Sequence, residues 1–329
     1  IDNGKVYFLS RPRRFGKSLT ISTFDALFSG KKELFAGLYA QEFLDRPNFS
    51  PSPVVRLDMS LTTTELGAEE LRASMMDILN DEAGRHGVAL TRPLPDRALT
   101  ELLGLLSRQG RVVVHVDEYD KPILDNLATP EQARILREGL RNFYSVIKGL
   151  DAHLKFVLLT GVSKFSKVSL FSGLNNLEDI TLDSRVATLC GYTHGELVVT
   201  YADWLDGVDL EEVRHWYNGY NFLGEPVYNP FDILLYLDSR EFKPYWFETG
   251  TPTFLIDRLR DRRVELPMLD GLWLEEDLLG SFDVDRIEPE TLLFQTGYLT
   301  IQERIWEFDS YRYRLGYPNR EVRVSLPRA

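Results

Sequence analysis

Eight consecutive residues near the start of the chain, Arg11–Ser18 (RPRRFGKS), have the types and spacing of a loop that binds phosphate groups. Gly16 lets the backbone curl so that its N–H groups face the phosphates, and a helix that follows presents the positive end of its dipole to them. In such a loop Lys17 reaches the β- and γ-phosphates and Ser18 is a ligand of Mg²⁺. The residues that we expect to contact a bound nucleotide are Arg11, Pro12, Arg13, Arg14, Phe15, Gly16, Lys17, Ser18 and Leu19.

The segments on either side of this loop have the patterns that its chemistry requires. Lys5–Ser10 (KVYFLS) is a short apolar run typical of a strand, and Leu19–Phe28 has apolar residues at helical spacing. One position departs from the pattern G-x-x-x-x-G-K-[ST], because Arg11 replaces the first glycine; Pro12 can still fix a tight turn. The alternative is a basic surface turn that contains GKS by chance, and the strand–loop–helix order argues against it.

A second group of candidate residues follows a strongly apolar run, Val112–Glu118 (VVVHVDE). A carboxylate at the end of a buried strand is costly unless its charge is balanced, and Mg²⁺ can balance it. We therefore expect Asp117 to belong to the coordination sphere of the metal, through water, and Glu118 to polarise the attacking water. The alternative interpretation is a cap or turn after an ordinary strand.

A third candidate position lies in Leu159–Ser163 (LTGVS), after the apolar run Lys155–Thr160. In ATPases with an additional central strand, a polar residue at the end of that strand senses the γ-phosphate, and Ser163 or Thr160 suits this place. We name Ser163 with Lys17 and Glu118 as the catalytic candidates. A Ser/Thr turn after a strand explains the same residues nearly as well.

The charge of the chain is concentrated around the predicted phosphate loop. The whole chain has a formal net charge of −12, whereas residues 1–32 carry seven basic and two acidic side chains. This distribution fits a local site for a polyanion better than a broad nucleic-acid surface. Arg11, Arg13 or Arg14 can add charge-assisted bonds to the nucleotide. For any single one of them, a position in solvent is the interpretation that we favour.

The composition is that of a soluble globular chain of 329 residues, 43% hydrophobic and 27% charged, with room for two domains. Apolar strands alternate with helices up to about residue 190, which predicts an α/β domain, 1–190, with a parallel sheet covered on both faces. We expect strands at Val54–Asp58, Arg111–Val116 and Ile180–Leu182 and helices at Glu65–Ala83, Leu99–Ser107 and Glu131–Lys148. Residues 191–329 are rich in aromatic side chains and predict a mostly helical region, with a winged-helix arrangement as one alternative.

Other constellations do not support an additional activity. Asp232 with Glu241 and Lys243 imitates the acids and lysine of a restriction-type nuclease, but the segment between them has a helical pattern where that site needs a strand. The single cysteine, Cys190, excludes an internal disulfide and fits a reducing compartment, so we expect a cytoplasmic location. No apolar run is long enough to span a membrane, so no membrane partner is expected.

Taken together, the segments FLSRPRRFGKSL, HVDEYDKPIL, CGYTHGEL, WYNGYNF and YNPFDILLYL resemble the bacterial AAA-ATPase-like family. This is a group of P-loop nucleoside triphosphatases related to archaeal and signal-transduction ATPases. In that family an arginine in place of the first glycine is normal. The resemblance implies a three-layer α/β fold of the AAA type, with ATP and Mg²⁺ as cofactors. It also implies a C-terminal PD-(D/E)xK nuclease domain in many members, which we expect to be absent from this chain.

The sequence therefore predicts a Mg²⁺-dependent ATPase without nuclease activity of its own. Coupling to a partner in nucleic-acid processing or defence is compatible with this hypothesis. The alternative is a nucleotide-gated switch or adaptor that hydrolyses ATP slowly and controls a partner or a fused nuclease. Association with further copies of the chain fits either hypothesis, whereas binding to nucleic acid is disfavoured by the net acidity. No guanine-reading N-K-x-D segment occurs, which favours ATP over GTP.

Overall fold

The structure is a computed structural model, and it describes residues 4–165, 170–171, 174, 176–250, 255–256, 266–276, 279 and 288–328. The chain forms two compact units. Unit one contains residues 1–9, 17–161 and 167–178, and unit two contains residues 10–16, 162–166 and 179–329. The two units are described separately below. The boundary at residue 190 stays a prediction.

A five-stranded sheet is the centre of the α/β fold, with the strand order β2-β3-β4-β1-β5. Strand β3 lies between β2 and β4 and is parallel to both. Its β-branched run of valines is fully buried, as expected for a strand covered on both faces. The predicted parallel sheet is therefore confirmed. The strands are β1 (Val6–Ser10), β2 (Val54–Asp58), β3 (Val112–Asp117), β4 (Leu154–Gly161) and β5 (Leu177–Asp179).

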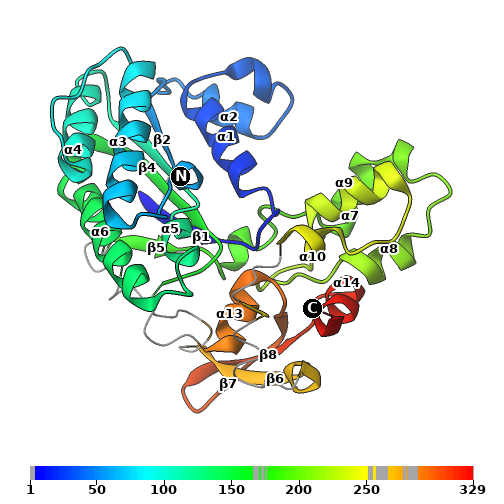
Figure 1. The fold of residues 1–329 in the computed structure, drawn as a ribbon. Coiled ribbons are helices and arrows are strands. Elements are labelled where there is room, and N and C mark those ends of the chain that lie inside the picture. Colours follow the sequence, from blue (N-terminus) through cyan, green and yellow to red (C-terminus); the bar gives the residue numbers. More distant parts are fainter. Residues whose placement is uncertain are drawn as a thin grey trace. The chain divides into compact units, whose positions relative to one another are not determined.

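Helices cover both faces of this sheet, so that unit one has three layers (Figure 1). Helix α1 packs against β3 and β4, while α3, α4 and α6 pack against one another on the opposite side. Helix α6 has a marked apolar face that buries Leu136, Leu140 and Phe143. The helices of this unit are α1 (Lys17–Phe28), α2 (Ala40–Leu44), α3 (Ala68–Arg85), α4 (Pro95–Leu106), α5 (Lys121–Leu124) and α6 (Pro130–Gly149).

The fifth strand lies three residues before the predicted position. We expected it at Ile180–Leu182, and the structure has it at Leu177–Asp179. Thr181 belongs instead to a turn, because its N–H donates to Asp179 Oδ1 (2.9 Å) and its hydroxyl accepts from the Ser10 N–H (3.0 Å). The apolar residues at positions 180 and 182 therefore follow the strand and do not form it.

Unit two is mostly helical and also contains a small antiparallel sheet with the order β6-β8-β7. The prediction of a mostly helical region is confirmed. The small sheet was not predicted. Helix α7 begins with a capping box between Thr193 and Glu196. The elements are α7 (His194–Thr200), α8 (Leu210–Tyr217), α9 (Pro230–Ser239), α10 (Tyr245–Gly250), β6 (Leu272–Glu275), α13 (Pro289–Thr296), β7 (Thr300–Glu307), β8 (Ser310–Gly316) and α14 (Arg320–Ser325).

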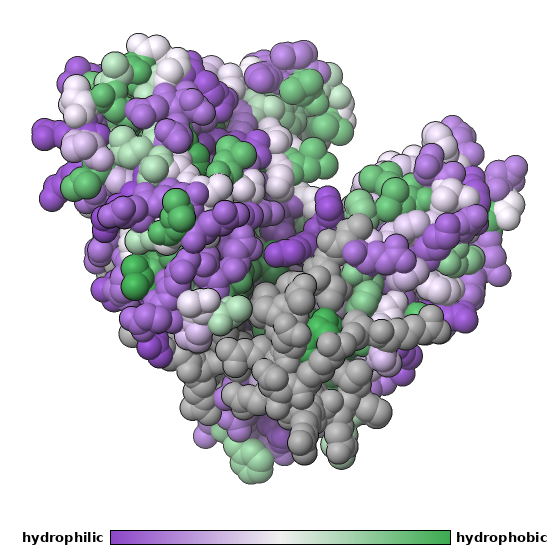
Figure 2. Space-filling model, viewed as in Figure 1, coloured by the Kyte–Doolittle hydropathy of each residue, from purple (hydrophilic) through white to green (hydrophobic). Residues whose placement is uncertain are grey.

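The surface carries mixed polar and apolar side chains (Figure 2). A few large apolar side chains are exposed around α2, namely Leu34, Leu38 and Tyr39. In the part of the chain that the structure describes, no helix has both the length and the apolar character that a membrane crossing needs.

Two carboxyl groups face each other in the interior of unit two. Asp232 on α9 and Glu321 on α14 are both completely buried. Glu321 Oε1 accepts hydrogen bonds from the backbone N–H groups of Trp246 (2.9 Å) and Phe247 (3.1 Å). The oxygens of Asp232 receive no well-formed hydrogen bond from the described residues. A proton held between the two carboxyl groups, with Asp232 as the donor, satisfies both of them.

Burial is the main cause of the unusual titration of this pair. Burial raises the pKa of Glu321 to about 7. Burial, and next the charge of Glu321, raises the pKa of Asp232 well above its usual range. Tyr217 and Tyr220 also face the two carboxyl groups, and Glu248 adds further negative charge beside Glu321. With acidic or phenolic groups around it, the pair retains a proton at neutral pH.

We expect this pair to make unit two less stable as the pH rises. The folded-state pKa of Glu321 exceeds its ordinary value of 4.5. The stability that the pair contributes is therefore fully present below about pH 4.5 and is lost as the pH rises through about 7. Asp232→Asn replaces the shared proton by a permanent amide donor. The variant should gain about 1–2 kcal/mol of unfolding free energy over the wild type at about pH 8.5 and nothing at about pH 4.5.

Urea unfolding at a series of pH values measures this difference. Asp238→Asn is the matched control, because Asp238 is exposed on the same helix. The same pH dependence in Asp232→Asn and the wild type would contradict the shared proton.

Candidate functional site

The predicted phosphate loop connects β1 to α1, and α1 begins at Lys17, directly after Gly16. The strand, loop and helix therefore follow one another as the sequence predicts. Gly16 has a φ of +82°, and a Cβ atom there would meet nothing within 4 Å. The glycine is thus required by its backbone conformation and not by a close contact. Arg14 also has a positive φ, +65°, so two of the three residues from Arg14 to Gly16 have positive φ.

Arg11, which stands in place of the first glycine, is completely buried in unit two. Its guanidinium donates hydrogen bonds to the carbonyl oxygens of Thr181 (2.8 Å), Val186 (3.2 Å) and Leu189 (3.3 Å). It also lies over the ring of Phe222, 3.9 Å from the centroid. Burial lowers the pKa of Arg11 to about 10. The expectation that a loop arginine lies in solvent is wrong for Arg11, and its guanidinium joins the loop to the chain after β5.

The rest of the loop is divided between buried and exposed side chains. Phe15 is buried and packs edge-on against Tyr220, with 4.8 Å between the ring centroids. Arg14 is exposed, and its guanidinium lies 5.0 Å from the ring centroid of Phe231. Arg13 is half-buried, and its carbonyl oxygen accepts a hydrogen bond from the indole of Trp246 (3.0 Å). The loop is thus held by contacts with three aromatic side chains, those of Tyr220, Phe231 and Trp246. The contact of Arg13, Arg14 and Phe15 with a nucleotide stays a prediction.

The first turn of α1 belongs to unit one and carries the remaining predicted contacts. Lys17 is buried, whereas Ser18 and Leu19 are exposed. An exposed serine hydroxyl at a helix N-terminus is accessible to a hydrated cation, and the first N–H groups of a helix have no partner within the helix. The exposure of Ser18 therefore suits the role that the sequence predicts for it, and the role of Lys17 stays a prediction.

Asp117 ends β3 as a buried carboxylate with three defined neighbours in unit one. Its Oδ1 accepts hydrogen bonds from the hydroxyl of Thr160 (2.7 Å) and from the backbone N–H of Glu118 (3.1 Å). Its Oδ2 lies 3.5 Å from Nη2 of Arg56. Asp117 and His115 alternate with Val116 along the strand, and His115 binds Asp25 of α1, so Asp117 projects from the face of the sheet that α1 covers.

A second carboxylate, Asp58, lies beside Asp117, and the sequence interpretation missed it. The two aspartates are register partners at the ends of the parallel strands β2 and β3. Arg56 Nη2 lies within 3.8 Å of Asp58 Oδ2 and within 3.5 Å of Asp117 Oδ2, so one guanidinium balances both charges. The signal for Asp58 was present, since VVRLD ends in an aspartate as VVVHVD does. Neighbouring parallel strands bring such ends together.

Glu118 occupies a strained turn at the end of β3. It is half-buried and has a φ of +49°, which is uncommon for a residue other than glycine. The chain then returns toward β4, where the N–H of Tyr119 donates to the carbonyl oxygen of Thr160 (3.0 Å). Gly161 allows this approach, because a Cβ there would lie 2.5 Å from the ring of Tyr119. The contact between Tyr119 and β4 thus fixes the backbone conformation of Glu118.

The two candidates for the γ-phosphate sensor occupy different places. Thr160 is buried in unit one and donates to Asp117. Ser163 is also buried, but it belongs to the residues 162–166 of unit two. The hydroxyl of Thr160 is therefore engaged with the acidic end of the sheet. The sensor role of Ser163 stays a prediction.

The oxygen atoms of this region are of the kind that Mg²⁺ prefers. Asp117 and Asp58 offer carboxylates, and Ser18 offers a hydroxyl. Among the described residues no group of three or more His, Cys, Asp or Glu side chains forms a closed metal cage. A cage is not needed for Mg²⁺, which keeps several waters and is held by one or two protein oxygens together with phosphates.

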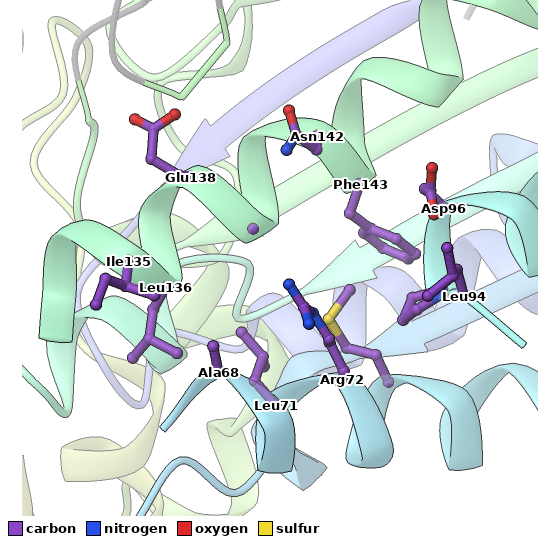
Figure 3. Close-up of a pocket in the computed structure, with 13 residues that line it drawn as sticks. Ala68, Leu71, Arg72, Leu94, Asp96, Ile135, Leu136, Glu138, Asn142 and Phe143 are labelled. Atoms are coloured by element: carbon purple, nitrogen blue, oxygen red, sulfur yellow. The ribbon is translucent and has the colours of Figure 1, made fainter. Parts of the chain in front are cut away.

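An apolar cavity of unit one lies elsewhere, between α3, α4 and α6 (Figure 3). It has a volume of about 640 Å³ and is lined mainly by apolar side chains, among them Leu71, Leu136 and Phe143. Its described lining includes no residue of the phosphate loop and no residue of the acidic end of the sheet. It therefore shares no described residue with the predicted nucleotide site.

The acid–lysine constellation that imitates a restriction-type nuclease, and against which the sequence argues, is not assembled in the described residues. Asp232 faces Glu321, as described above, whereas Glu241 and Lys243 are exposed and form an ion pair with each other. Asp232 is thus part of the interior of unit two and not of a surface acid–lysine site.

The sequence of the chain is similar to sequences of known proteins. The sequence model of a family described as "Predicted AAA-ATPase" matches residues 1–171, which include the phosphate loop, Asp117 and Thr160. The chain is also 51% identical over 332 residues to an "Uncharacterized protein in vnfD 5'region" of Azotobacter chroococcum mcd 1. This similarity covers 100% of the chain and 64% of the relative. The chain therefore spans less than two thirds of that protein's length.

We expect the hydroxyl of Thr160 to stabilise the fold through Asp117. Thr160→Val keeps the shape of the side chain but leaves the buried carboxylate without its shortest hydrogen bond. The free energy of unfolding should fall by about 1–3 kcal/mol in urea titrations. Thr100→Val is the matched control, because that threonine donates its hydroxyl to a backbone carbonyl at an exposed position. Equal losses in the two variants would contradict the role of Thr160.

Proposed function

The chain belongs to the AAA-ATPase-like family, and from this we propose that it binds ATP with Mg²⁺ and hydrolyses it. The observation that supports the proposal most strongly is the arrangement within unit one. Helix α1 begins at Lys17 without a gap after Gly16, and it packs on β3, which ends in the buried Asp117. A cationic helix start and a buried carboxylate on the same side of a parallel sheet suit a triphosphate and its metal.

Each residue has a defined part in the proposed reaction. Lys17 and the backbone N–H groups from Gly16 to Ser18 bind the β- and γ-phosphates. Ser18 and Asp117 hold Mg²⁺, Asp117 through water, and the bound ion neutralises the charge that develops on the phosphate oxygens. Glu118 accepts a hydrogen bond from the attacking water and orients it toward the γ-phosphate. Thr160 keeps the carboxylate of Asp117 oriented, and Ser163 is the proposed sensor of the γ-phosphate.

One observation favours the second candidate function, a nucleotide-gated switch with slow hydrolysis. Asp117 Oδ2 lies 3.5 Å from Arg56, whose guanidinium already balances part of its charge. A bound metal ion would compete with that cation for the same carboxylate. Nucleotide binding would then shift Arg56, and the shift would be the signal to a partner. The proposed partner is a further copy of the chain, a nucleic acid or a nuclease domain. The proposed location of the protein is the cytoplasm.

Two substitutions test the ATPase proposal. Lys17→Ala should weaken ATP binding by about 10- to 100-fold, because it removes a charge-assisted bond to the phosphates. Glu118→Gln should leave binding unchanged and lower kcat by about 100-fold or more, because the amide cannot accept a proton from water. Equilibrium binding of ATP and GTP with Mg²⁺, together with release of phosphate, measures both effects.

The controls for this experiment separate the two candidate functions. Lys148→Ala removes an exposed lysine on α6 and should change neither binding nor turnover. Tight binding with slow turnover in the wild type, unchanged in Glu118→Gln, would favour the switch. Wild-type binding and turnover in Lys17→Ala would remove the basis of both functions.

A further inference from the structure

The phosphate loop receives a hydrogen bond from a tryptophan more than 200 residues further along the chain. The indole Nε1–H of Trp246, on α10, donates to the carbonyl oxygen of Arg13 at 3.0 Å. Trp246 is completely buried. Its ring packs against those of Tyr298 and Tyr220, with centroid distances of 5.0 Å and 6.3 Å. All of these residues belong to unit two.

This hydrogen bond fixes the direction of the next N–H group of the loop. A trans peptide is planar, so its C=O and N–H point in opposite directions. No cis peptide bond occurs in the described part of the chain. When Trp246 holds the carbonyl of Arg13 toward the interior, the N–H of Arg14 must point away from it. A loop that binds an anion needs its N–H groups on one side and its carbonyl groups on the other.

Trp246 is itself held on several sides. Its own backbone N–H donates to Glu321 Oε1 at 2.9 Å, so the buried carboxyl pair fixes the start of α10. Gly297 packs directly against Pro12 and Trp246. A Cβ at this position would lie 2.8 Å from the ring of Pro12 and 3.3 Å from the indole of Trp246. Pro12 and Trp246 thus share one closely packed space. Because the donor is rigidly held, its acceptor in the loop is already ordered before a ligand binds. The loop then loses little conformational entropy on binding.

We propose that Trp246 is a positioning residue for the phosphate loop, which holds the peptide between Arg13 and Arg14 in the orientation that binds nucleotide. The inference rests on the proposed function, because it concerns the same loop. It adds that a residue outside the phosphate-binding motif sets the affinity of that motif. Trp246 acts through the backbone and does not contact the nucleotide.

Trp246→Phe tests this inference, because phenylalanine keeps an aromatic ring against Tyr298 but has no N–H. The dissociation constant for ATP with Mg²⁺ should rise about tenfold, because the partly buried carbonyl of Arg13 loses the indole donor that holds it. The change should appear in KM and leave kcat within about twofold, because the residues at the reacting phosphate are unaltered. A fall in kcat with an unchanged KM would overturn the inference.

Trp216→Phe is the matched control. The indole of Trp216 donates to Glu212 Oε1, also at 3.0 Å and also in unit two. Its removal should leave ATP binding unchanged. If Trp246→Phe does not fold, benzothienylalanine at position 246 retains the bicyclic shape and replaces the N–H by sulfur. If the wild type and the folded position-246 variant bind ATP with equal affinity, the inference is overturned but the proposed function is not. A wild type that binds no nucleotide would overturn the proposed function instead.

Discussion

A fully buried guanidinium has to find acceptors for its N–H groups, and Arg11 finds them in the main chain. The carbonyl oxygens of Thr181, Val186 and Leu189 accept its hydrogen bonds, and the ring of Phe222 covers one face. Desolvating an arginine is costly, and this cost is offset only while all the acceptors stay in place. The start of the phosphate loop and the segment after β5 therefore depend on each other. An arginine at the position of the usual glycine is thus a structural requirement of this loop.

The acidic end of the sheet depends on a comparable balance. Asp117 is buried, so its charge must be compensated from nearby, and Thr160, the Glu118 N–H and Arg56 each supply part of the compensation. Asp58 shares Arg56, because parallel strands place their carboxyl ends side by side. The strained backbone of Glu118 follows from the same arrangement, since the chain must turn sharply to bring Tyr119 to β4. Rigid surroundings of this kind keep charged groups in a fixed orientation.

Local patterns in the sequence predict the parallel sheet of the α/β fold and the order in the chain of most of its strands and helices. Val54–Asp58 was predicted as a strand with the bounds that the structure has, because β-branched residues and a buried face coincide there. The fifth strand was misplaced because Ile180–Leu182 has strand-like residue types but uses its polar groups in a turn. Asp58 was missed although its signal was local. Trp246 could not be found in this way, since a hydrogen bond across more than 200 residues leaves no periodicity in the sequence.

The phosphate-binding motif is contiguous in sequence, but its supports are not. Arg11, Arg13 and Phe15 are held by Phe222, Trp246 and Tyr220, all of which lie beyond residue 190. In evolutionary terms, the motif-bearing segment and the aromatic C-terminal region are not interchangeable modules. A recombination event that joined this loop to a different helical partner would leave a buried arginine and an inward-facing carbonyl without their neighbours. The motif-bearing segment and the aromatic C-terminal region must therefore be inherited together, and substitutions in one should be matched by substitutions in the other.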